Sequence, residues 1–315
     1  MKVHPERQIE VNKNNLQQLL SLYNITDFEF EVFTLGIENT SIKILTNDKN
    51  YVLRVYSQKN KPDQDIELEL EFQDFLRQES IPIPVVYRNN SNQELSGVVV
   101  DDQRWQFILM EFVDGEHPED YSDELSIELA EIQAKMHILG LEFAKKVGKN
   151  DKEVQEMYDT IWPTRQEVIV SHDHDPKIKE FMQRARAMHV KITPDLPRGY
   201  NHLDLDFGGN IVTKDGYILA ILDFDDLSFS ACVVCLGNTL WHIFYKTESR
   251  EKIDFYLSTY LKIRNLSSLE RKILPEIILF RNYAIGILKY TLDNDIETVK
   301  RIMNLEKQIK EFKFE

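Results

Sequence analysis

The stretch Tyr200–Asp226, Y-N-H-L-D-L-D-F-G-G-N-I-V-T-K-D-G-Y-I-L-A-I-L-D-F-D-D, is the part of the sequence that decides the fold. Two apolar runs, Asn210–Thr213 and Tyr217–Leu222, flank a turn-forming Lys-Asp-Gly triplet. This pattern predicts a short β-hairpin. Because antiparallel strands place their outer ends side by side, the hairpin brings Asn210 and Asp223 to the same end.

Asn210 and Asp223 offer an amide oxygen and a carboxylate at that end. Mg²⁺ prefers hard oxygen ligands and is commonly bound by one or two carboxylates together with substrate phosphates. Asp204 lies just upstream, with His202 two residues before it, and is a candidate to accept the proton of a substrate hydroxyl. These residues in this order indicate a phosphoryl-transfer site.

Length and composition indicate a globular protein with two lobes. The chain has 315 residues, of which 42% are hydrophobic and 29% charged, enough for two separate cores. No apolar run approaches the ~20 residues of a membrane span, and the N-terminus lacks the apolar segment of a signal peptide. We therefore expect a cytoplasmic protein with no membrane partner. The sequence does not indicate an oligomeric state.

The charge distribution narrows the class of partner. The net charge of −15 argues against nucleic acid or an anionic membrane surface as a partner. Residues 111–240 carry 13 basic and 25 acidic side chains, so the acidity peaks in the segment that contains the predicted site. A cationic substrate and a solvated acidic surface explain this excess equally well.

Periodicity predicts an α+β fold with two lobes. The first has a leading helix at 13–22, strands at 28–34, 41–45, 51–56, 97–100 and 106–110, and an inserted helix at 63–78. The second is predicted to be helical apart from the hairpin, with helices at 123–139, 151–160, 176–190, 232–246, 250–262, 267–292 and 295–312. We expect a small five-stranded lobe with one inserted helix, residues 1–112, and a larger, mainly helical lobe, residues 113–315.

This order of elements and motifs resembles the bilobal protein-kinase-like fold, and more narrowly the aminoglycoside phosphotransferase and choline kinase family. Residues 210–224 have the spacing of Asn and Asp that is usual in that family. Y-V-L-R-V-Y at 51–56 is similar to the third strand of that family. I-L-M-E-F-V-D-G at 108–115 is similar to the crossover segment between the lobes, whose backbone binds adenine. I-P-I-P at 81–84 is also typical, so the resemblance covers nearly the whole chain.

The resemblance implies an ATP- and Mg²⁺-dependent enzyme and gives each matching residue a role. Asp204 corresponds to the catalytic base, and His202 to the residue that braces its loop. Asn210 and Asp223 would bind the metal ions. Arg54 stands where a basic residue contacts the ATP phosphates, to which a guanidinium can bind through two nitrogens.

The same resemblance implies the other nucleotide contacts. A glutamate on the helix at 63–78 would pair with Arg54; spacing favours Glu69, with Glu67 and Glu71 open as alternatives. The turn at 35–41 would cover the phosphates, and the backbone of the crossover would hydrogen-bond adenine. The implied nucleotide-binding residues are Arg54, Glu69, Gly36, Asn39, Glu111 and Val113.

Two features depart from the family pattern. The resemblance implies four residues between the base and the metal-binding Asn, but five stand between Asp204 and Asn210. Either one residue bulges out of the loop, which the adjacent glycines would permit, or Asp206 is the base. His202 favours Asp204. The position of a later bracing Asp falls on Cys235, so that part of the bracing must differ.

Four other features have simpler explanations than a site. Cys232 and Cys235 have CxxC spacing, but buried helix positions explain them better than metal or redox chemistry. The histidines at 172 and 174 lie in a polar run that indicates a solvated loop. His137 and His242 are interpreted as satisfied histidines of the core.

These observations predict an O-phosphotransferase that moves the γ-phosphoryl group of ATP to the hydroxyl of a small, cationic molecule. The acceptor would resemble an aminoglycoside, choline or an amino alcohol, and would lie near Asp206, Asp225 or Asp226. Two alternatives stay open. One is a kinase for a hydroxy-amino acid or a protein hydroxyl, and the other is a nucleotide-binding pseudokinase with a regulatory role.

Overall fold

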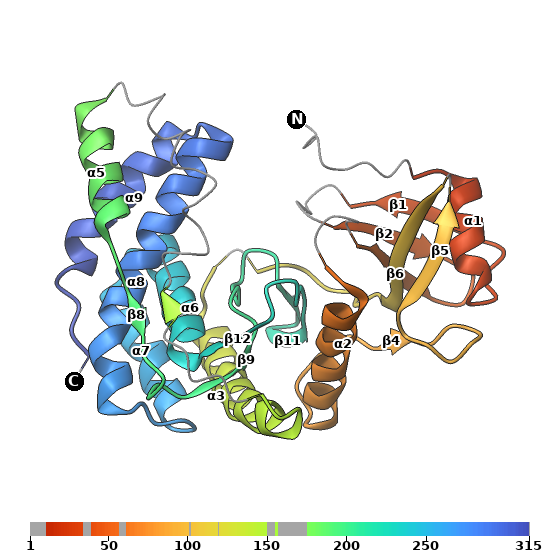
Figure 1. The fold of residues 1–315 in the computed structure, drawn as a ribbon, viewed down its shortest axis with the longest axis horizontal. Helices are drawn as coiled ribbons and strands as arrows, with labels where there is room; N and C mark the ends of the chain where they lie inside the picture. The colour runs from red at the N-terminus through yellow and green to blue at the C-terminus, as the bar shows by residue number, and fades with distance from the viewer. Residues whose placement is uncertain are drawn as a thin grey trace. The chain divides into compact units, whose positions relative to one another are not determined.

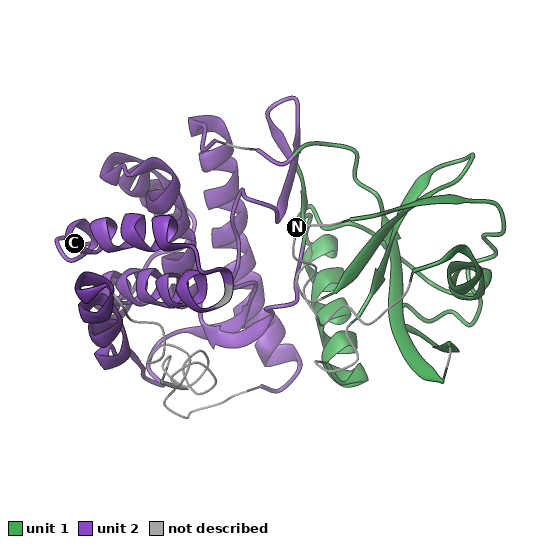
Figure 2. Cartoon of the chain, turned by 90° about the horizontal axis from the view of Figure 1, so that it is seen from above, with its two compact units in different colours: residues 1–116, 219–222 green, residues 117–218, 223–315 purple. Residues whose placement is uncertain are grey.

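The computed structural model describes residues 11–33, 39–56, 61–100, 102–118, 120–149, 155–156 and 175–314, except for the side chains of residues 155, 156 and 292. Gly36 and the histidines at 172 and 174 lie outside the described residues. The chain divides into two compact units, Met1–Glu116 with Leu219–Leu222, and His117–Ile218 with Asp223–Glu315 (Figure 2). The first unit thus extends a few residues beyond the expected 1–112 and includes part of the hairpin.

The first unit is built on a six-stranded sheet with the order β1-β2-β3-β6-β4, in which β5 also pairs with β6 (Figure 1). Its strands are β1 Glu29–Val32, β2 Thr40–Leu45, β3 Asn50–Val55, β4 Val86–Tyr87, β5 Ser96–Val100 and β6 Gln103–Glu111. All five predicted strands are present. The two-residue β4 was missed because such a short segment has no detectable periodicity.

Two helices cover opposite faces of this sheet. Helix α1, Lys13–Ser21, begins at Asn12, whose side chain accepts a hydrogen bond from the backbone of Asn15. Its leucines pack with Phe107 and Leu109 in one cluster, whereas Ile108 packs with residues of α2, Asp63–Gln78, in another. The alternation along β6 follows from the two-residue period of a strand.

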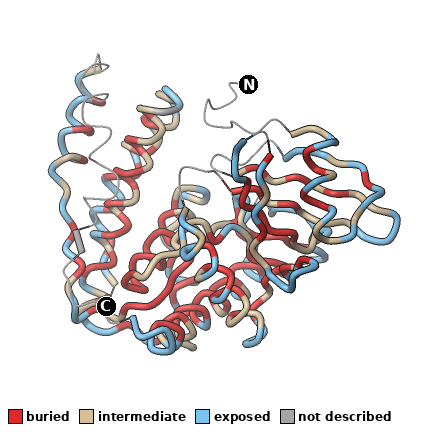
Figure 3. Tube along the Cα trace, turned by 45° about the vertical axis from the view of Figure 1, so that its right-hand side comes forward, coloured by how far each residue is buried: buried red, intermediate tan, exposed pale blue. Residues whose placement is uncertain are grey.

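The second unit is mainly helical, as predicted. Its helices are α3 Asp123–Lys146, α5 Pro176–Ala187, α6 Cys232–Thr247, α7 Arg250–Leu261, α8 Ser268–Leu288, the π-helical turn η2 Lys289–Asp293, and α9 Ile296–Ile309. Helix α6 is buried along most of its length and packs against α7 and α8. Figure 3 colours the chain by burial and shows long buried runs in both units. A helix that is apolar on most sides belongs at the centre of a core. In the part of the chain that the structure covers, no helix is long and apolar enough to cross a membrane.

The hairpin is present as β10 Ile211–Lys214 and β11 Tyr217–Ile221. The prediction that the rest of the lobe is helical was wrong in two places. Strand β9, Arg198–Asn201, pairs with β12, Ser228–Ala231, and β7, Gln155–Glu156, pairs with β8, Lys191–Ile192. These strands have two to four residues, too few to carry a pattern. Strand β7 also replaces part of the helix expected at 151–160.

Helix α3 and strand β9 approach each other through two glycines. A Cβ atom added to Gly140 would lie 2.2 Å from the carbonyl oxygen of Tyr200, and one added to Gly199 would lie 2.6 Å from the backbone of Gly140 and Leu141. Side chains at either position therefore cannot be accommodated without movement of the backbone. This contact fixes β9, the strand that leads directly into His202.

Candidate active site

The His202–Asn210 loop begins where β9 ends. His202 is buried, its ring meets Phe224 edge-on at 4.7 Å between centroids, and its Nδ1 accepts a hydrogen bond of 3.4 Å from the backbone nitrogen of Asp204. Between them, Leu203 has a φ of 63°. This left-handed conformation is uncommon for a bulky residue. This turn at Leu203 accompanies the contact between the backbone of Asp204 and the buried histidine.

The carboxylate of Asp204 is held by an arginine and a histidine. Arg281 donates from Nη2 to Oδ1 at 2.7 Å, and Nε2 of His242 lies 3.6 Å from the same oxygen. Burial raises the pKa of the Asp204 carboxyl, but the contact with His242 and the charge of Arg281 outweigh burial, so the pKa lies below its usual range. Asp204 is therefore ionised at neutral pH.

Asp206 is bound to the same histidine. Its Oδ2 lies 3.1 Å from Nδ1 of His242, and its Oδ1 accepts a hydrogen bond of 2.6 Å from the backbone nitrogen of Gly208. His242 therefore bridges Asp204 and Asp206. Its interpretation as a satisfied histidine of the core was wrong, because helical spacing alone does not show what lies opposite a helix face.

The additional residue of the loop is accommodated in a turn at 207–209. Neither glycine of this turn has a positive φ, so the left-handed freedom expected of them is not used. Despite the extra residue, Asn210 reaches back to Asp204, donating from Nδ2 to its carbonyl oxygen at 2.7 Å and to Oδ2 at 3.3 Å. The amide nitrogen is thus engaged, and the amide oxygen is the atom that can bind a cation.

Asp223 follows β11 and is exposed, with a φ of 63°. Desolvation raises the pKa of nearby Asp226, and the charges of Asp204 and Asp223 raise it further, against the opposing effect of Arg281. The charges of two other carboxylates thus disfavour the charged form of Asp226. A divalent cation would relieve this repulsion, and the oxygen donors of Asn210 and Asp223 suit Mg²⁺.

A second set of potential metal ligands overlaps the loop. Ligand atoms of Asp204, Asp206 and His242 lie within 4.8 Å of one another. The guanidinium of Arg281 already occupies Oδ1 of Asp204, however, and its charge would repel a metal ion. This set is better described as a polar network around Asp204, in which Arg281 forms an ion pair and His242 contacts both carboxylates.

Helix α6 supports the His202–Asn210 loop through side-chain hydrogen bonds. Asn238 donates to the carbonyl oxygen of Leu203 at 2.8 Å, and Thr239 donates to that of Leu205 at 3.0 Å. Cys235 is buried next to them, and burial raises the pKa of its thiol to about 11. Neutral donors from α6 therefore provide bracing on this side of the loop, which explains how Cys235 can stand at the expected Asp position.

In the first unit, Glu69 lies on the buried face of α2 and is 2% exposed, whereas Glu67 and Glu71 are exposed. The helix face therefore singles out Glu69 among the three candidates. Its carboxylate accepts hydrogen bonds from Lys61 at 2.7 Å and from Gln73 at 3.1 Å. Lys61 was not foreseen as a partner of this glutamate. Arg54 is half-buried on β3.

Residues of the predicted adenine crossover lie at the end of β6. The backbone nitrogen of Glu111 donates to the carbonyl oxygen of Val85 at 2.8 Å, and its side chain accepts from Val85 at 3.2 Å. The carbonyl oxygen of Glu111 is therefore the group that can meet a ligand. Val113 and Asn39 are half-buried, the latter just before β2.

Arg281 is the site residue that the sequence interpretation missed. It lies on α8 in the run I-I-L-F-R-N-Y-A-I-G-I-L, residues 277–288, which is otherwise nearly free of charge. A charged residue there must have a partner, since burying an isolated charge is costly. That exception to the apolar pattern was a usable signal, although it does not identify the partner.

The interpretations of Cys232 and Cys235 are confirmed, and His137 lies in the core as expected, although only its Nδ1 has a hydrogen-bond partner among the described residues. Both thiols are buried and free on α6. His137 is buried, and its Nδ1 forms a hydrogen bond of 2.6 Å with the hydroxyl of Tyr260.

A family model described as "Phosphotransferase enzyme family" matches residues 29–271. Homoserine kinase of Rhodopseudomonas palustris is 25% identical over 292 residues, which cover 89% of this chain and 84% of that protein. Homoserine kinase of Granulibacter bethesdensis is 23% identical over 273 residues, with coverage of 84% and 82%.

Two solved structures share the fold along almost their whole length. A microcompartment-associated aminopropanol kinase has a TM-score of 0.74 at 17% identity and covers 95% of each chain. An amicoumacin kinase in complex with AMP-PNP, Ca²⁺ and amicoumacin has a TM-score of 0.69 at 18% identity and covers 96% of each chain. The predicted family and kinase-like fold are confirmed.

The matched region contains both the basic strand β3 and the entire segment from His202 to Asp226. On this match, the chain belongs to the phosphotransferase enzyme family and is a small-molecule kinase.

Proposed function

We propose that this protein transfers the γ-phosphoryl group of ATP to the hydroxyl of a small molecule that carries an amino group. The observation that carries the proposal is the contact between Asp204 and Asn210 within one loop. It joins a candidate base to a candidate metal ligand, as phosphoryl transfer requires.

Asp204 would orient the acceptor hydroxyl. Because its pKa lies below the usual range, its carboxylate accepts a hydrogen bond well but is a weak base. This suits phosphoryl transfer through a loose transition state, in which positioning matters more than early proton removal. His202 would set the direction of Asp204 through its backbone contact, and Arg281 would fix the carboxylate rotamer.

Asn210 and Asp223 would hold Mg²⁺, which supplies charge neutralisation to the phosphates when bound. Arg54 would contact the nucleotide phosphates, and buried Glu69 would order the cations near it. The crossover carbonyl oxygen of Glu111 and the backbone of Val113 would hydrogen-bond the base; Gly36 and Asn39 remain assigned to the phosphate-covering turn.

The charges around Asp204 favour a zwitterionic acceptor over a purely cationic one. Asp206, Asp225 and Asp226 can bind an ammonium group. The guanidinium of Arg281, which is bound to Asp204, would repel a molecule that carries positive charge alone. A hydroxy-amino acid offers a carboxylate to Arg281 as well. The homoserine kinases among the relatives support this choice, and the aminopropanol kinase supports an amino alcohol as the second candidate.

The proposal is tested by measuring ADP release with Mg²⁺ and ATP against homoserine, 1-amino-2-propanol, choline and spectinomycin. We expect turnover with homoserine above the others, and its loss in EDTA. Replacing Asp204 by Ala should reduce kcat by about 10²–10⁴-fold, whereas Lys135→Gln, an exposed change on α3, should have no effect. ATP-dependent turnover that survives Asp204→Ala would show that another residue orients the acceptor.

Arg281→Met distinguishes the two acceptor classes. If Arg281 binds a substrate carboxylate, the variant should raise KM for homoserine about tenfold or more, and should lower kcat equally for both acceptors. An equal KM change for 1-amino-2-propanol would exclude carboxylate recognition by this residue. Nucleotide binding without turnover on any acceptor would instead indicate a pseudokinase.

A further inference from the structure

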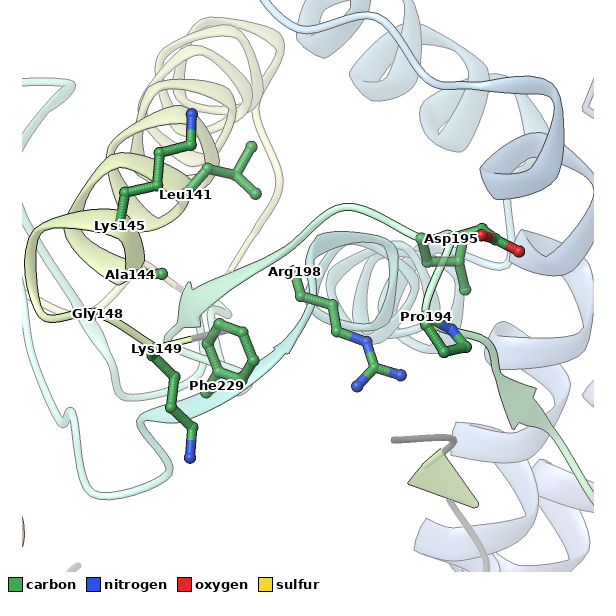
Figure 4. Close-up of a pocket in the computed structure, with 10 residues that line it drawn as sticks. Leu141, Ala144, Lys145, Gly148, Lys149, Pro194, Asp195, Arg198 and Phe229 are labelled. Atoms are coloured by element: carbon green, nitrogen blue, oxygen red, sulfur yellow. The ribbon is translucent and has the colours of Figure 1, made fainter. Parts of the chain in front are cut away.

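The helical unit contains a cavity of about 700 Å³ that lies apart from the His202–Asn210 loop. It is formed by the end of α3, the segment after β8 and strands β9 and β12 (Figure 4). Its lining residues are Leu141, Ala144, Lys145, Gly148, Lys149, Pro194, Asp195, Leu196, Arg198 and Phe229.

Arg198 is the residue whose burial and hydrogen bonding indicate that the cavity binds a ligand. It is 9% exposed and donates from Nη2 to the carbonyl oxygen of Ile192 at 2.8 Å. Among the residues that the structure describes, its Nε and Nη1 atoms have no hydrogen-bond partner. Figure 4 shows the side chain extending between Phe229 and Pro194. A buried guanidinium with so few acceptors is costly, and an anion in the cavity would offset that cost.

The rim adds further positive charge. Lys145 and Lys149 line the cavity and are exposed. Lysines near the C-terminal end of a helix are also favoured by the helix dipole. The last carbonyl oxygens of α3 already accept backbone hydrogen bonds, however, that of Ala144 from Lys149 and that of Lys145 from Gly148. The dipole does not explain Arg198, which belongs to β9. Of the lining residues Asp195 is the one acid, and its carboxylate points away from Arg198 in Figure 4.

Phe229 gives the cavity an apolar, flat wall. Its ring packs against Tyr200 at 5.7 Å between centroids, and the ammonium of Lys149 lies 5.8 Å from the ring centre. A ring held in this way can stack against a planar group, while the cations bind a charged one.

We infer that this cavity binds a small anionic molecule, with a phosphate or carboxylate for Arg198 and the rim lysines and a planar apolar group for Phe229. This site goes beyond the proposed phosphoryl transfer and uses none of its residues. Arg198 stands four residues before His202 on the chain, and Phe229 lies on the strand paired with β9. Such a ligand is therefore placed to act as an effector.

The test is calorimetric titration of the full chain with phenyl phosphate and with inorganic phosphate. The double variant Lys145→Gln/Lys149→Gln should keep the wild-type melting temperature, because both side chains are exposed. It should raise the Kd for phenyl phosphate about fivefold or more, since each exposed charge contributes about a factor of two to five. Lys146→Gln is the matched control, an exposed lysine between them that does not line the cavity.

We expect phenyl phosphate to bind more tightly than inorganic phosphate and Lys146→Gln to bind like the wild type. The inference is overturned if phenyl phosphate gives no heat up to about 10 mM. It is equally overturned if the double variant and Lys146→Gln bind phenyl phosphate alike, because the anion would then bind elsewhere. These results do not depend on turnover, so they stand whether or not the proposed reaction is found.

Discussion

Replacing Gly140 by Ala should damage both stability and catalysis, because Gly140 is where α3 touches the strand that leads to the candidate base. The new Cβ would lie 2.2 Å from the carbonyl oxygen of Tyr200, an atom that cannot rotate away. Ordinary contact begins at 3.4 Å, so helix and strand must separate by roughly 1 Å. Overpacking of this severity costs about 3 kcal/mol or more. The better helix propensity of Ala returns about 1 kcal/mol.

The net loss of unfolding free energy should therefore be about 2 kcal/mol or more, measured by urea denaturation. A shift of roughly 1 Å carried along β9 to Asp204 should lower kcat by about 10²-fold under conditions where the variant is folded. Glu142→Ala, an exposed change on the same helix, should stay within about 0.5 kcal/mol of the wild type. A Gly140→Ala protein as stable and as active as the wild type would refute the reasoning.

Three further changes test separate contacts. Thr239→Val keeps the shape of the side chain but leaves the carbonyl of Leu205 without its donor; unfolding free energy should fall by about 1–3 kcal/mol and kcat should fall more than KM changes. An unchanged kcat would show that the loop does not need the hydrogen bond from Thr239. Lys61→Met should destabilise the first unit by about 1–3 kcal/mol because it leaves the buried Glu69 carboxylate without that cation, and a double-mutant cycle with Glu69→Gln that gives no coupling would count against the pair. Burial raises the pKa of Glu306, but hydrogen bonds with Arg184, Lys310 and Tyr283 lower it to about 2 from 4.5. The stability that this carboxylate contributes to the fold is complete above pH 4.5 and is lost as the pH falls toward 2, at up to about 1.4 kcal/mol per pH unit. In Glu306→Gln, the free energy of unfolding should therefore lack that part of its dependence on acid pH.

The sequence predicted those structural features around the candidate site that depend on order and spacing along the chain. The hairpin between Asn210 and Asp223 follows from two apolar runs and a turn, and both strands are where the pattern places them. Glu69 was favoured over its neighbours by spacing, and it is the one of the three glutamates that α2 buries; its pairing with Arg54 stays a prediction.

The sequence did not reveal contacts that arise from packing between distant helices. Arg281 lies 77 residues after Asp204, and His242 lies on a different helix again. Helical periodicity identifies a buried face but not the loop that it will face, so His242 was taken for a packing residue. The pairs β9–β12 and β7–β8 were missed for a related reason, since strands this short are specified by their partners.

The left-handed backbone at Leu203 and Asp223 has a consequence for how this protein can change over time. Each conformation costs of order 1–3 kcal/mol for a residue other than glycine. Glycine at either place would relieve that strain but would remove the Leu203 side chain or the Asp223 carboxylate. Selection for stability alone would therefore favour glycine at these two positions, and a lineage that no longer needs the reaction should lose them early. Glycine at either position in a descendant of this chain would therefore indicate that the side chain is no longer required.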